Sequence, residues 1–292
     1  MKKAADVPSI DSLPSAAGHP RSLPKIMGVL NVTPDSFFDG GRYTGESAWA
    51  RFEEMVREGA DLIDIGGESS RPGSGRVGQD EELRRVSGLL RRFHERRSTL
   101  PAGLAVSIDT MKAAVASLAV DSGAGVINDI SALRHEPDGM LDALHRRPGV
   151  NIVLMHMRGD PATMQADPRY DDVVGEVEAF FEERLRFVQD NGVSLDRVIL
   201  DPGIGFGKTL DHNLRLLRHL SEMKRRLGRP VLIGASRKSF IGLILNGAGP
   251  QDRLEGSLAA ALWCADHNVD YLRVHDVCAT RRALGVWAAM AG

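Results

Sequence analysis

The feature that most restricts the fold of this sequence is a repeated pattern in which a short apolar segment ends in a polar residue. In the clearest copy, residues 197–200 lead to Asp201, and a glycine-rich segment follows at once. Similar copies lie at residues 63–68, 106–109, 126–129 and 153–156. Because glycine lets the backbone approach a ligand closely, the pattern predicts one binding site built from the ends of many strands.

Eight short segments rich in Val, Ile and Leu are typical of β-strands. They cover residues 25–30, 61–65, 104–108, 125–129, 151–155, 197–200, 230–233 and 270–274. Most of them do not alternate between apolar and polar residues, as expected for strands buried on both faces of a parallel sheet.

Between the strands, apolar residues recur at three- and four-residue spacing, which predicts helices. The clearest stripes lie at residues 49–56, 173–188 and 214–223. Thr110 and Ser236 follow strands directly, and we expect them to be the N-caps of the next helices.

Eight strand–helix units with no linker between them fit a closed (β/α)8 barrel. An open, doubly wound sheet is the alternative, but its first strand would lead to a glycine fingerprint, whereas this one leads to Asn31-Val32-Thr33-Pro34. We therefore predict the α/β class, with a single TIM barrel over residues 25–292. Residues 1–24 contain several prolines and no long apolar run, so we expect a disordered, flexible N-terminal tail.

Composition excludes several classes of protein. The chain has 292 residues and a formal net charge of -2, which gives no support for sequence-independent binding to nucleic acid. No segment approaches the roughly 18 apolar residues that a membrane span needs. Cys264 and Cys278 lack the spacing of a zinc site or a disulfide framework, so we expect reduced thiols. The sequence predicts a soluble, cytoplasmic protein with no nucleic-acid or membrane partner.

Residues just past the strand ends meet at one mouth of a TIM barrel. In this sequence they are Asn31, Asp64 or Glu68, Asp109, Asn128, His156, Asp201, Ser236 to Lys238, Arg273 and His275. A single polar residue in such a position is more often a turn residue than a ligand contact. A whole series in register is hard to explain by turns alone, and it predicts a binding site.

One subset of these residues suits hydrogen bonding to a flat heterocycle. It consists of Asp109, Asn128, Asp201 and Lys238. Carboxylates offer paired acceptors to adjacent N–H donors, and lysine donates to a carbonyl oxygen or a ring nitrogen. A pterin or a guanine has such an edge. The apolar residues Ile130, Met155 and Phe206 either pack on this ring or belong to the core.

A second subset suits an anion. It consists of Ser70, Arg71, Arg273 and His275. Guanidinium groups bind phosphate oxygens through paired bonds, which predicts a mono- or diphosphate at one end of the site. No metal cage is visible in the sequence, so any Mg2+ would be held through ligand phosphates and one or two side-chain oxygens.

Two further motifs fail on inspection. Gly207-Lys208-Thr209 ends like a phosphate-binding P-loop, but Pro202 occupies the position of the earlier glycine. Residues 234–238 begin like a nucleophile elbow but end in Lys238 where a glycine belongs.

Several motifs resemble those of the dihydropteroate synthase family. They lie, in the family's order, at residues 28–37, 68–73, 107–110, 127–130, 155–157, 201–208, 236–239 and 273–276. The resemblance implies a TIM barrel, a homodimer and a sulfonamide target. It also implies a transferase of folate biosynthesis, which joins 6-hydroxymethyl-7,8-dihydropterin pyrophosphate to p-aminobenzoate and releases pyrophosphate.

The same resemblance implies a role for individual residues. The pterin would be held by Asp109, Asn128, Ile130, Met155, Asp201, Phe206 and Lys238. The pyrophosphate would be held by Asn31, Arg71, Arg273 and His275, with Asn31 acting through Mg2+. The p-aminobenzoate would be held by Ser70, Arg71, Pro72, Phe206, Lys238 and Ser239. Asp109, Lys238 and Arg71 are expected to be catalytic. Ser70 stands where the family most often has Thr, so the hydroxyl is kept and a methyl is lost.

Two alternatives share the pterin site. A methyltetrahydrofolate–corrinoid methyltransferase has a related barrel but would not need residues 68–73 or 236–239. A non-catalytic pterin-binding paralogue would be expected to lose Asn31, Ser70, Arg71 and Lys238, and all four are present.

Overall fold

A computed structural model describes residues 22–32, 45–69, 75–160 and 163–291 of the chain. These residues form an eight-stranded sheet. Its strands are β1 (Lys25–Asn31), β2 (Leu62–Gly66), β3 (Ala105–Asp109), β4 (Val126–Asp129), β5 (Asn151–Met155), β6 (Val198–Asp201), β7 (Leu232–Ile233) and β8 (Tyr271–Val274). Each predicted strand overlaps one of them.

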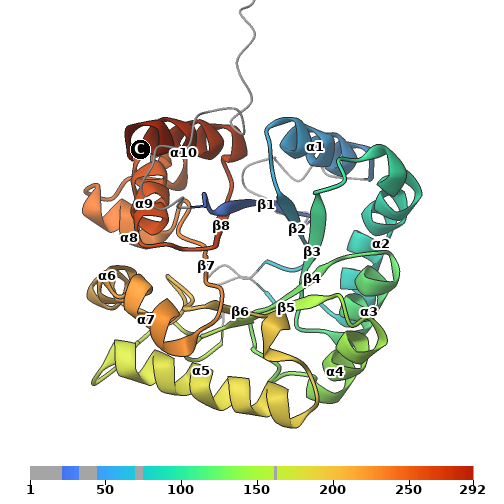
Figure 1. Ribbon diagram of the computed structural model, residues 1–292, viewed down its shortest axis with the longest axis horizontal. Coiled ribbons are helices and arrows are strands. Elements are labelled where there is room, and N and C mark those ends of the chain that lie inside the picture. Colours follow the sequence, from blue (N-terminus) through green and yellow to red (C-terminus); the bar gives the residue numbers. More distant parts are fainter. Residues whose placement is uncertain (1–21, 33–44, 70–74, 161–162, 292) are drawn as a thin grey trace, which may run out of the picture.

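The strands pair in parallel in the order β6-β5-β4-β3-β2-β1-β8-β7. The sheet curves into a barrel (Figure 1), and its edge strands β6 and β7 meet through a bridge between Leu200 and Val231. There the Leu200 N–H donates to the Pro230 carbonyl at 2.9 Å. The predicted (β/α)8 architecture is confirmed.

Helices surround the barrel, as Figure 1 shows. They are α1 (Gly45–Arg57), α2 (Gln79–Arg96), α3 (Ala113–Asp121), α4 (Pro137–Arg146), α5 (Val173–Asp190), α6 (Leu210–Arg218), α7 (Leu220–Leu227), α8 (Ser239–Ile244), α9 (Leu254–Asp266) and α10 (Val277–Ala291). Within the described ranges, no helix is both long enough and apolar enough to cross a bilayer.

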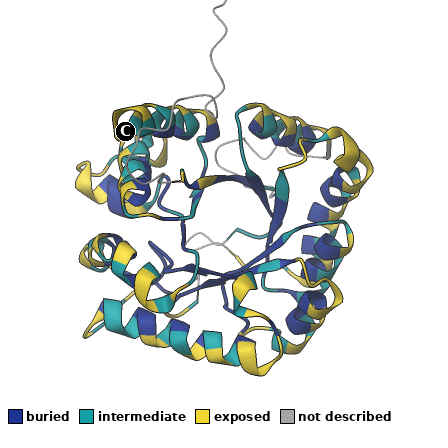
Figure 2. Ribbon diagram, viewed as in Figure 1, coloured by how far each residue is buried: buried dark blue, intermediate teal, exposed yellow. Residues whose placement is uncertain are grey.

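Apolar side chains form two layers, one on each side of the strands. Ile26 and Ile63 belong to the large cluster between sheet and helices, whereas their neighbours Met27 and Leu62 belong to a smaller cluster inside the barrel. Successive strand residues point to opposite faces, so both kinds of position must be apolar. This explains why the strands, which are mostly dark blue in Figure 2, show little alternation in sequence.

Two expectations about the helices are wrong. The stripe at residues 214–223 is not one helix, because the chain breaks at His219 between α6 and α7. Thr110 and Ser236 are not N-caps, since α3 starts after Lys112 and α8 after Lys238. Their hydroxyls accept other hydrogen bonds: the Lys112 N–H donates to Thr110 Oγ1, and the His275 N–H donates to Ser236 Oγ.

Candidate active site

The interior of the barrel changes from apolar to polar toward the carboxyl ends of the strands. Two positions beyond the interior residues Leu62, Val126, Ile199 and Tyr271 stand Asp64, Asn128, Asp201 and Arg273. Inward-facing strand residues are two positions apart, so these polar side chains share the interior. Strand register also places Gly66 opposite both Asn31 and Asp109, and Asp109 opposite Asn128.

A buried ion network lies at the base of this polar layer. The Nε of Arg273 donates to Asp64 Oδ2 at 2.7 Å, and its Nη2 donates to Asp109 Oδ2 at 2.7 Å. Asn128 Nδ2 donates to the same Asp64 oxygen at 3.0 Å. One guanidinium therefore joins side chains of β2, β3 and β8. Its planar fork fixes the orientation of both carboxylates.

Two buried oxygens beside this network have no hydrogen-bond partner within the described residues. They are Asp64 Oδ1 and Ser107 Oγ, which stand on register-paired residues of β2 and β3. Buried polar atoms of this kind usually bind an ordered water molecule or a ligand group. The base of the site is thus still able to accept hydrogen bonds.

Burial shifts the titration of the two aspartates at the site. It raises the pKa of Asp109 to about 7. The positive charge of Arg273 acts to lower this pKa, and the negative charge of Asp64 acts to raise it. Burial also raises the pKa of Asp201, although the Gly203 N–H and the charge of Lys238 act in the opposite direction. Carboxyl groups of raised pKa in a cleft are typical of functional sites.

A narrow pocket lies over the network. It is lined by Asp109, Asn128, Ile130, Met155, Asp201, Ile204, Phe206, Gly234, Lys238 and Arg273. Every residue expected to hold the pterin is among them, and Arg273 from the expected pyrophosphate set lines the same pocket. Ile204 and Gly234 were not anticipated. The structure therefore brings the predicted heterocycle-binding residues together in one cavity.

The walls of the pocket differ in character. Ile130, Met155 and Phe206 belong to one apolar cluster, and Lys238 Nζ lies 3.8 Å from the centre of the Phe206 ring. Carboxylate and amide groups line the rest. Apolar flanks with a few fixed polar groups suit a flat ring that has a hydrogen-bonding edge.

The loop after β6 needs its glycines. Gly203 and Gly205 have φ values of 67° and 82°, a left-handed conformation that favours glycine. A Cβ on Gly203 would also collide with the His156 carbonyl oxygen. In this conformation the Gly203 N–H donates to Asp201 Oδ1 at 2.8 Å and holds that carboxylate.

The loops after β7 and β8 are joined beside the pocket. The His275 N–H donates to Ser236 Oγ at 3.3 Å, and the His275 ring Nδ1 lies 3.2 Å from the same oxygen. Ser239 is the exposed first residue of α8. The remaining predicted contacts, Ser70, Arg71 and Pro72, lie outside the described residues.

A buried charge cluster next to the site was not predicted from the sequence. Lys112 Nζ bonds to Glu68 Oε2 at 2.5 Å and to Glu82, whose side chain is fully buried. Glu68 Oε1 accepts from the Val77 N–H at 3.2 Å. Helical spacing was an available signal, because Glu82 precedes Val86 by four residues on the buried face of α2.

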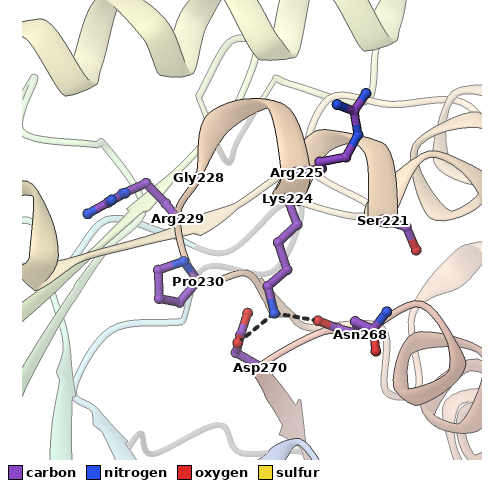
Figure 3. Close-up of a pocket in the computed structure, with 8 residues that line it drawn as sticks. All are labelled: Ser221, Lys224, Arg225, Gly228, Arg229, Pro230, Asn268 and Asp270. Atoms are coloured by element: carbon purple, nitrogen blue, oxygen red, sulfur yellow. Dashed lines mark hydrogen bonds and ion pairs between the residues drawn. The ribbon is translucent and has the colours of Figure 1, made fainter. Parts of the chain in front are cut away.

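A second pocket lies near the starts of β7 and β8 (Figure 3). It is lined by Ser221, Lys224, Arg225, Gly228, Arg229, Pro230, Asn268 and Asp270. Lys224 Nζ donates to the Asn268 carbonyl at 2.7 Å and to Asp270 Oδ1 at 2.8 Å. Arg225 and Arg229 pair with acidic residues as well. Balanced charges at the amino ends of barrel strands indicate a role in stability.

Known proteins match this chain over most of its length. The sequence profile of the pterin binding enzyme family matches residues 27–275. The chain is 44% identical over 272 residues to the dihydropteroate synthase of Neisseria meningitidis serogroup B, covering 91% of this chain and 93% of that protein. It is 44% identical over 266 residues to the dihydropteroate synthase of Escherichia coli K12, covering 91% of each.

The chain belongs to the dihydropteroate synthase family.

Solved structures of dihydropteroate synthases share its fold. The Yersinia pestis dihydropteroate synthase in a sulfonamide drug complex has a TM-score of 0.85 at 42% identity, and 94% of this chain and 96% of that chain are covered. The Xanthomonas albilineans dihydropteroate synthase in complex with 7,8-dihydropteroate has a TM-score of 0.80 at 42% identity, with the same coverage.

The metal site expected for a dihydropteroate synthase can be tested on Asn31. No group of three or more His, Cys, Asp or Glu side chains in the described part of the chain could hold a metal ion. Asn31 ends β1, and a Cβ added to its register partner Gly66 would lie 3.3 Å from Asn31 Oδ1. One amide oxygen at the mouth fits Mg2+, which keeps several waters and binds substrate phosphates.

Proposed function

We propose that this chain condenses 6-hydroxymethyl-7,8-dihydropterin pyrophosphate with p-aminobenzoate to form 7,8-dihydropteroate. The bond between the pterin methylene carbon and the pyrophosphate oxygen breaks, and pyrophosphate leaves with the electron pair. A bond from the methylene carbon to the amine nitrogen forms, and the amine loses a proton. The pocket lined by Asp109, Asn128, Asp201 and Lys238 is the observation that carries this proposal.

The donor and acceptor pattern of the pocket matches the pterin edge. Asp201 accepts hydrogen bonds from the pterin amino group and the adjacent ring N–H, while Lys238 donates to a carbonyl oxygen or a ring nitrogen. Asn128 can donate and accept, and it is oriented by its bond to Asp64. Phe206, Met155 and Ile130 pack on the faces of the ring.

Charge at the site favours departure of pyrophosphate. As the carbon–oxygen bond breaks, positive charge develops on the pterin, and the carboxylate of Asp109 stabilises it. Arg273, His275 and Arg71 bind the leaving phosphate oxygens. Arg273 contacts both Asp64 and Asp109 and lines the same pocket, so its charge lies beside the pterin subsite.

Mg2+ belongs to this proposal as the cofactor. It would be held by Asn31 and by substrate phosphate oxygens, and when bound it would supply positive charge that neutralises the leaving group. Asn31 itself orients the phosphate end of the substrate toward the mouth of the barrel.

The p-aminobenzoate binds beside the start of α8, where Phe206, Lys238 and Ser239 would contact it. Ser70, Arg71 and Pro72 are proposed as its further contacts. Aniline nitrogen is nucleophilic when neutral, so the amine needs no strong base. Holding the two reactants in line contributes much of the rate enhancement.

Assembly and location also remain proposals. The chain forms a homodimer through α8, α9 and α10. Within the described residues, the large exposed apolar side chains lie on these helices or directly after α8: Leu243, Ile244, Leu245, Trp263, Val286 and Met290. Exposed apolar side chains on neighbouring helices (Figure 1) are typical of a protein–protein contact. Sedimentation of the purified protein tests this.

A cytoplasmic location agrees with the free thiols of Cys264 and Cys278.

The decisive experiment combines purified protein, both substrates and Mg2+. Dihydropteroate is measured by chromatography, and pyrophosphate is measured by a coupled assay. We expect one equivalent of each. Asp201→Asn is the matched control, because it keeps the size of the side chain but replaces one acceptor with a donor. Pterin binding without product would instead identify a non-catalytic paralogue.

A further inference from the structure

Lys208 is a buried cation that the proposed chemistry does not use. It stands at the end of the glycine-rich loop between β6 and α6, and only 3% of its surface is exposed. Lysine is almost never so fully buried unless its ammonium group is paired. Its position beside the pterin pocket therefore needs an explanation.

The ammonium group of Lys208 contacts three acceptors from two strand ends. Nζ donates to the Phe206 carbonyl at 3.0 Å and to the His156 carbonyl at 3.4 Å. It also lies 3.0 Å from His156 Nδ1. His156 follows β5 directly, and Phe206 lies in the loop after β6. Lys208 thus ties these two strand ends together.

The partner histidine is held as a neutral acceptor. Burial lowers the pKa of His156 to about 2, and the charge of Lys208 lowers it in the same direction. The ring is fixed by the edge of Phe180, with centroids 4.9 Å apart. Because the imidazole is neutral, Nδ1 can accept from the ammonium while Nε2 carries the proton.

One residue that Lys208 holds is expected to contact the pterin, and the other is the chain neighbour of such a residue. Phe206 supplies an apolar wall of the pocket, and Met155 precedes His156 in the chain. The His156 N–H donates to the Asp201 carbonyl at 2.9 Å, which joins the same two strand ends a second time. A shift at Lys208 would therefore move the Phe206 ring and the Asp201 carboxylate together.

We propose that Lys208 is a positioning residue for the pterin site. Its ammonium group fixes the Phe206 wall through the two strand ends, and its positive charge favours the carboxylate form of Asp201. This rests on the proposed function only in taking the ligand to be a pterin, whose donors need the carboxylate form of Asp201.

Electrostatics agrees with this geometry. Burial lowers the pKa of Lys208 to about 7. The negative charge of Asp201 acts to raise this pKa, whereas the positive charges of Lys238 and Arg158 lower it further. Lys208 in turn lowers the pKa of Asp201 against the effect of burial. The ammonium form is therefore lost as pH rises through the neutral range.

Calorimetric binding of 6-hydroxymethyl-7,8-dihydropterin to the whole protein between pH 6 and 9 tests the proposal. We expect Lys208→Gln, which keeps a donor but not the charge, to bind about tenfold more weakly at pH 7. The wild-type affinity should fall on the alkaline side, where Lys208 loses the charge with which it holds Phe206 and His156, and this fall should be absent from the variant. Affinity for pyrophosphate alone should change less than about twofold.

Lys224→Gln is the matched control. Lys224 also bonds to a carbonyl and an acidic residue, but it lies at the second pocket (Figure 3), so its loss should leave pterin binding unchanged. A Lys208→Gln protein that melts at lower temperature yet keeps the wild-type pH profile would overturn the proposal, since Lys208 would then be only structural. Wild-type affinity at pH 7 would overturn it as well.

A measurement on the wild-type protein covers the case in which Lys208→Gln does not fold. Lysine labelled with 13C at Cε reports the titration of Lys208 by NMR, and pterin binding should raise its pKa. An unchanged titration would refute the proposal. Dihydropteroate formation is assayed separately, so a failure of the synthase activity is distinguishable from a failure of the Lys208 role.

Discussion

Arg237 donates to both carboxylate oxygens of Asp276, from Nε at 2.8 Å and from Nη2 at 2.5 Å, and thereby joins the loop after β7 to the loop after β8. Arg237 has a φ of 58°, a conformation that costs a non-glycine residue about 1 kcal/mol or more. The bonds to Asp276 help to hold it there. Lys238 follows Arg237 and His275 precedes Asp276, so this pair sets the spacing of two proposed substrate contacts.

Removing the charge of Asp276 should therefore impair catalysis without removing a substrate contact. We expect Asp276→Asn to lower kcat/KM by about tenfold, or ~1.4 kcal/mol, because Arg237 is no longer held by paired bonds to a carboxylate. Steady-state assays with each substrate varied in turn measure this. Asp196→Asn removes an exposed partner of Arg229 and should have no effect. Wild-type kcat/KM in Asp276→Asn would contradict the prediction.

The sequence predicts the parts of the fold that depend on local pattern. Strands buried on both faces appear as short apolar runs, and the residue at the end of each run lies at the mouth of the barrel. Asp109, Asn128 and Asp201 could therefore be assigned to one site from the sequence alone. The same reasoning found Lys238, which follows β7 by a few residues.

Interactions between distant segments could not be predicted in this way. Ser236 looks like an N-cap in sequence, but its hydroxyl accepts from His275, 39 residues away. Lys208 resembles part of a failed P-loop motif, and only the fold reveals its contact with His156, 52 residues away. The break at His219 is equally invisible, because α6 and α7 share one apolar periodicity.

The raised pKa of Asp109 predicts how pterin affinity depends on pH. The carboxylate form is the one that accepts hydrogen bonds from the pterin, and with a pKa of about 7 it is a minor species at acidic pH. We expect affinity to rise by about tenfold per pH unit well below pH 7 and to level off near pH 7, before the alkaline fall expected from Lys208. Asp109→Asn should bind more weakly with a flat acidic limb. An acidic limb that survives in this variant would assign the titration to another group.

Folding stability should respond to Asp109 in the opposite sense. Its pKa in the folded protein, about 7, is higher than its ordinary value of 3.8, so the folded state binds more protons between these values. The contribution of Asp109 to stability is therefore present below about pH 4 and is lost as pH rises through 7. Comparing urea unfolding of the wild type and Asp109→Asn at about pH 5 and about pH 8 isolates this contribution.

The buried pair of Lys112 and Glu82 should be important for stability. Glu82→Gln leaves Lys112 with only Glu68 as an acidic partner, and we expect a loss of about 2 to 3 kcal/mol in urea unfolding. The double variant Glu82→Leu with Lys112→Met should recover part of this loss, because no unpaired charge stays buried. Glu222→Gln disrupts an exposed pair with Arg225 and should cost less than about 0.5 kcal/mol. Equal losses of unfolding free energy in Glu82→Gln and Glu222→Gln would show that burial of Glu82 has no special effect.

Magnesium should act at the phosphate end of the site and not at the pterin end. We expect a chelator to stop dihydropteroate formation while leaving the affinity for 6-hydroxymethyl-7,8-dihydropterin unchanged, since Asp201 and Lys238 need no metal.

Asn31→Ala should raise the Mg2+ concentration needed for half-maximal activity by about tenfold, because one of few protein ligands is lost. Calorimetry of pyrophosphate binding with and without Mg2+ gives a readout independent of turnover. Undiminished product formation after chelation would rule out the proposed metal, and an unaltered Mg2+ requirement in Asn31→Ala would show that the ion is bound elsewhere.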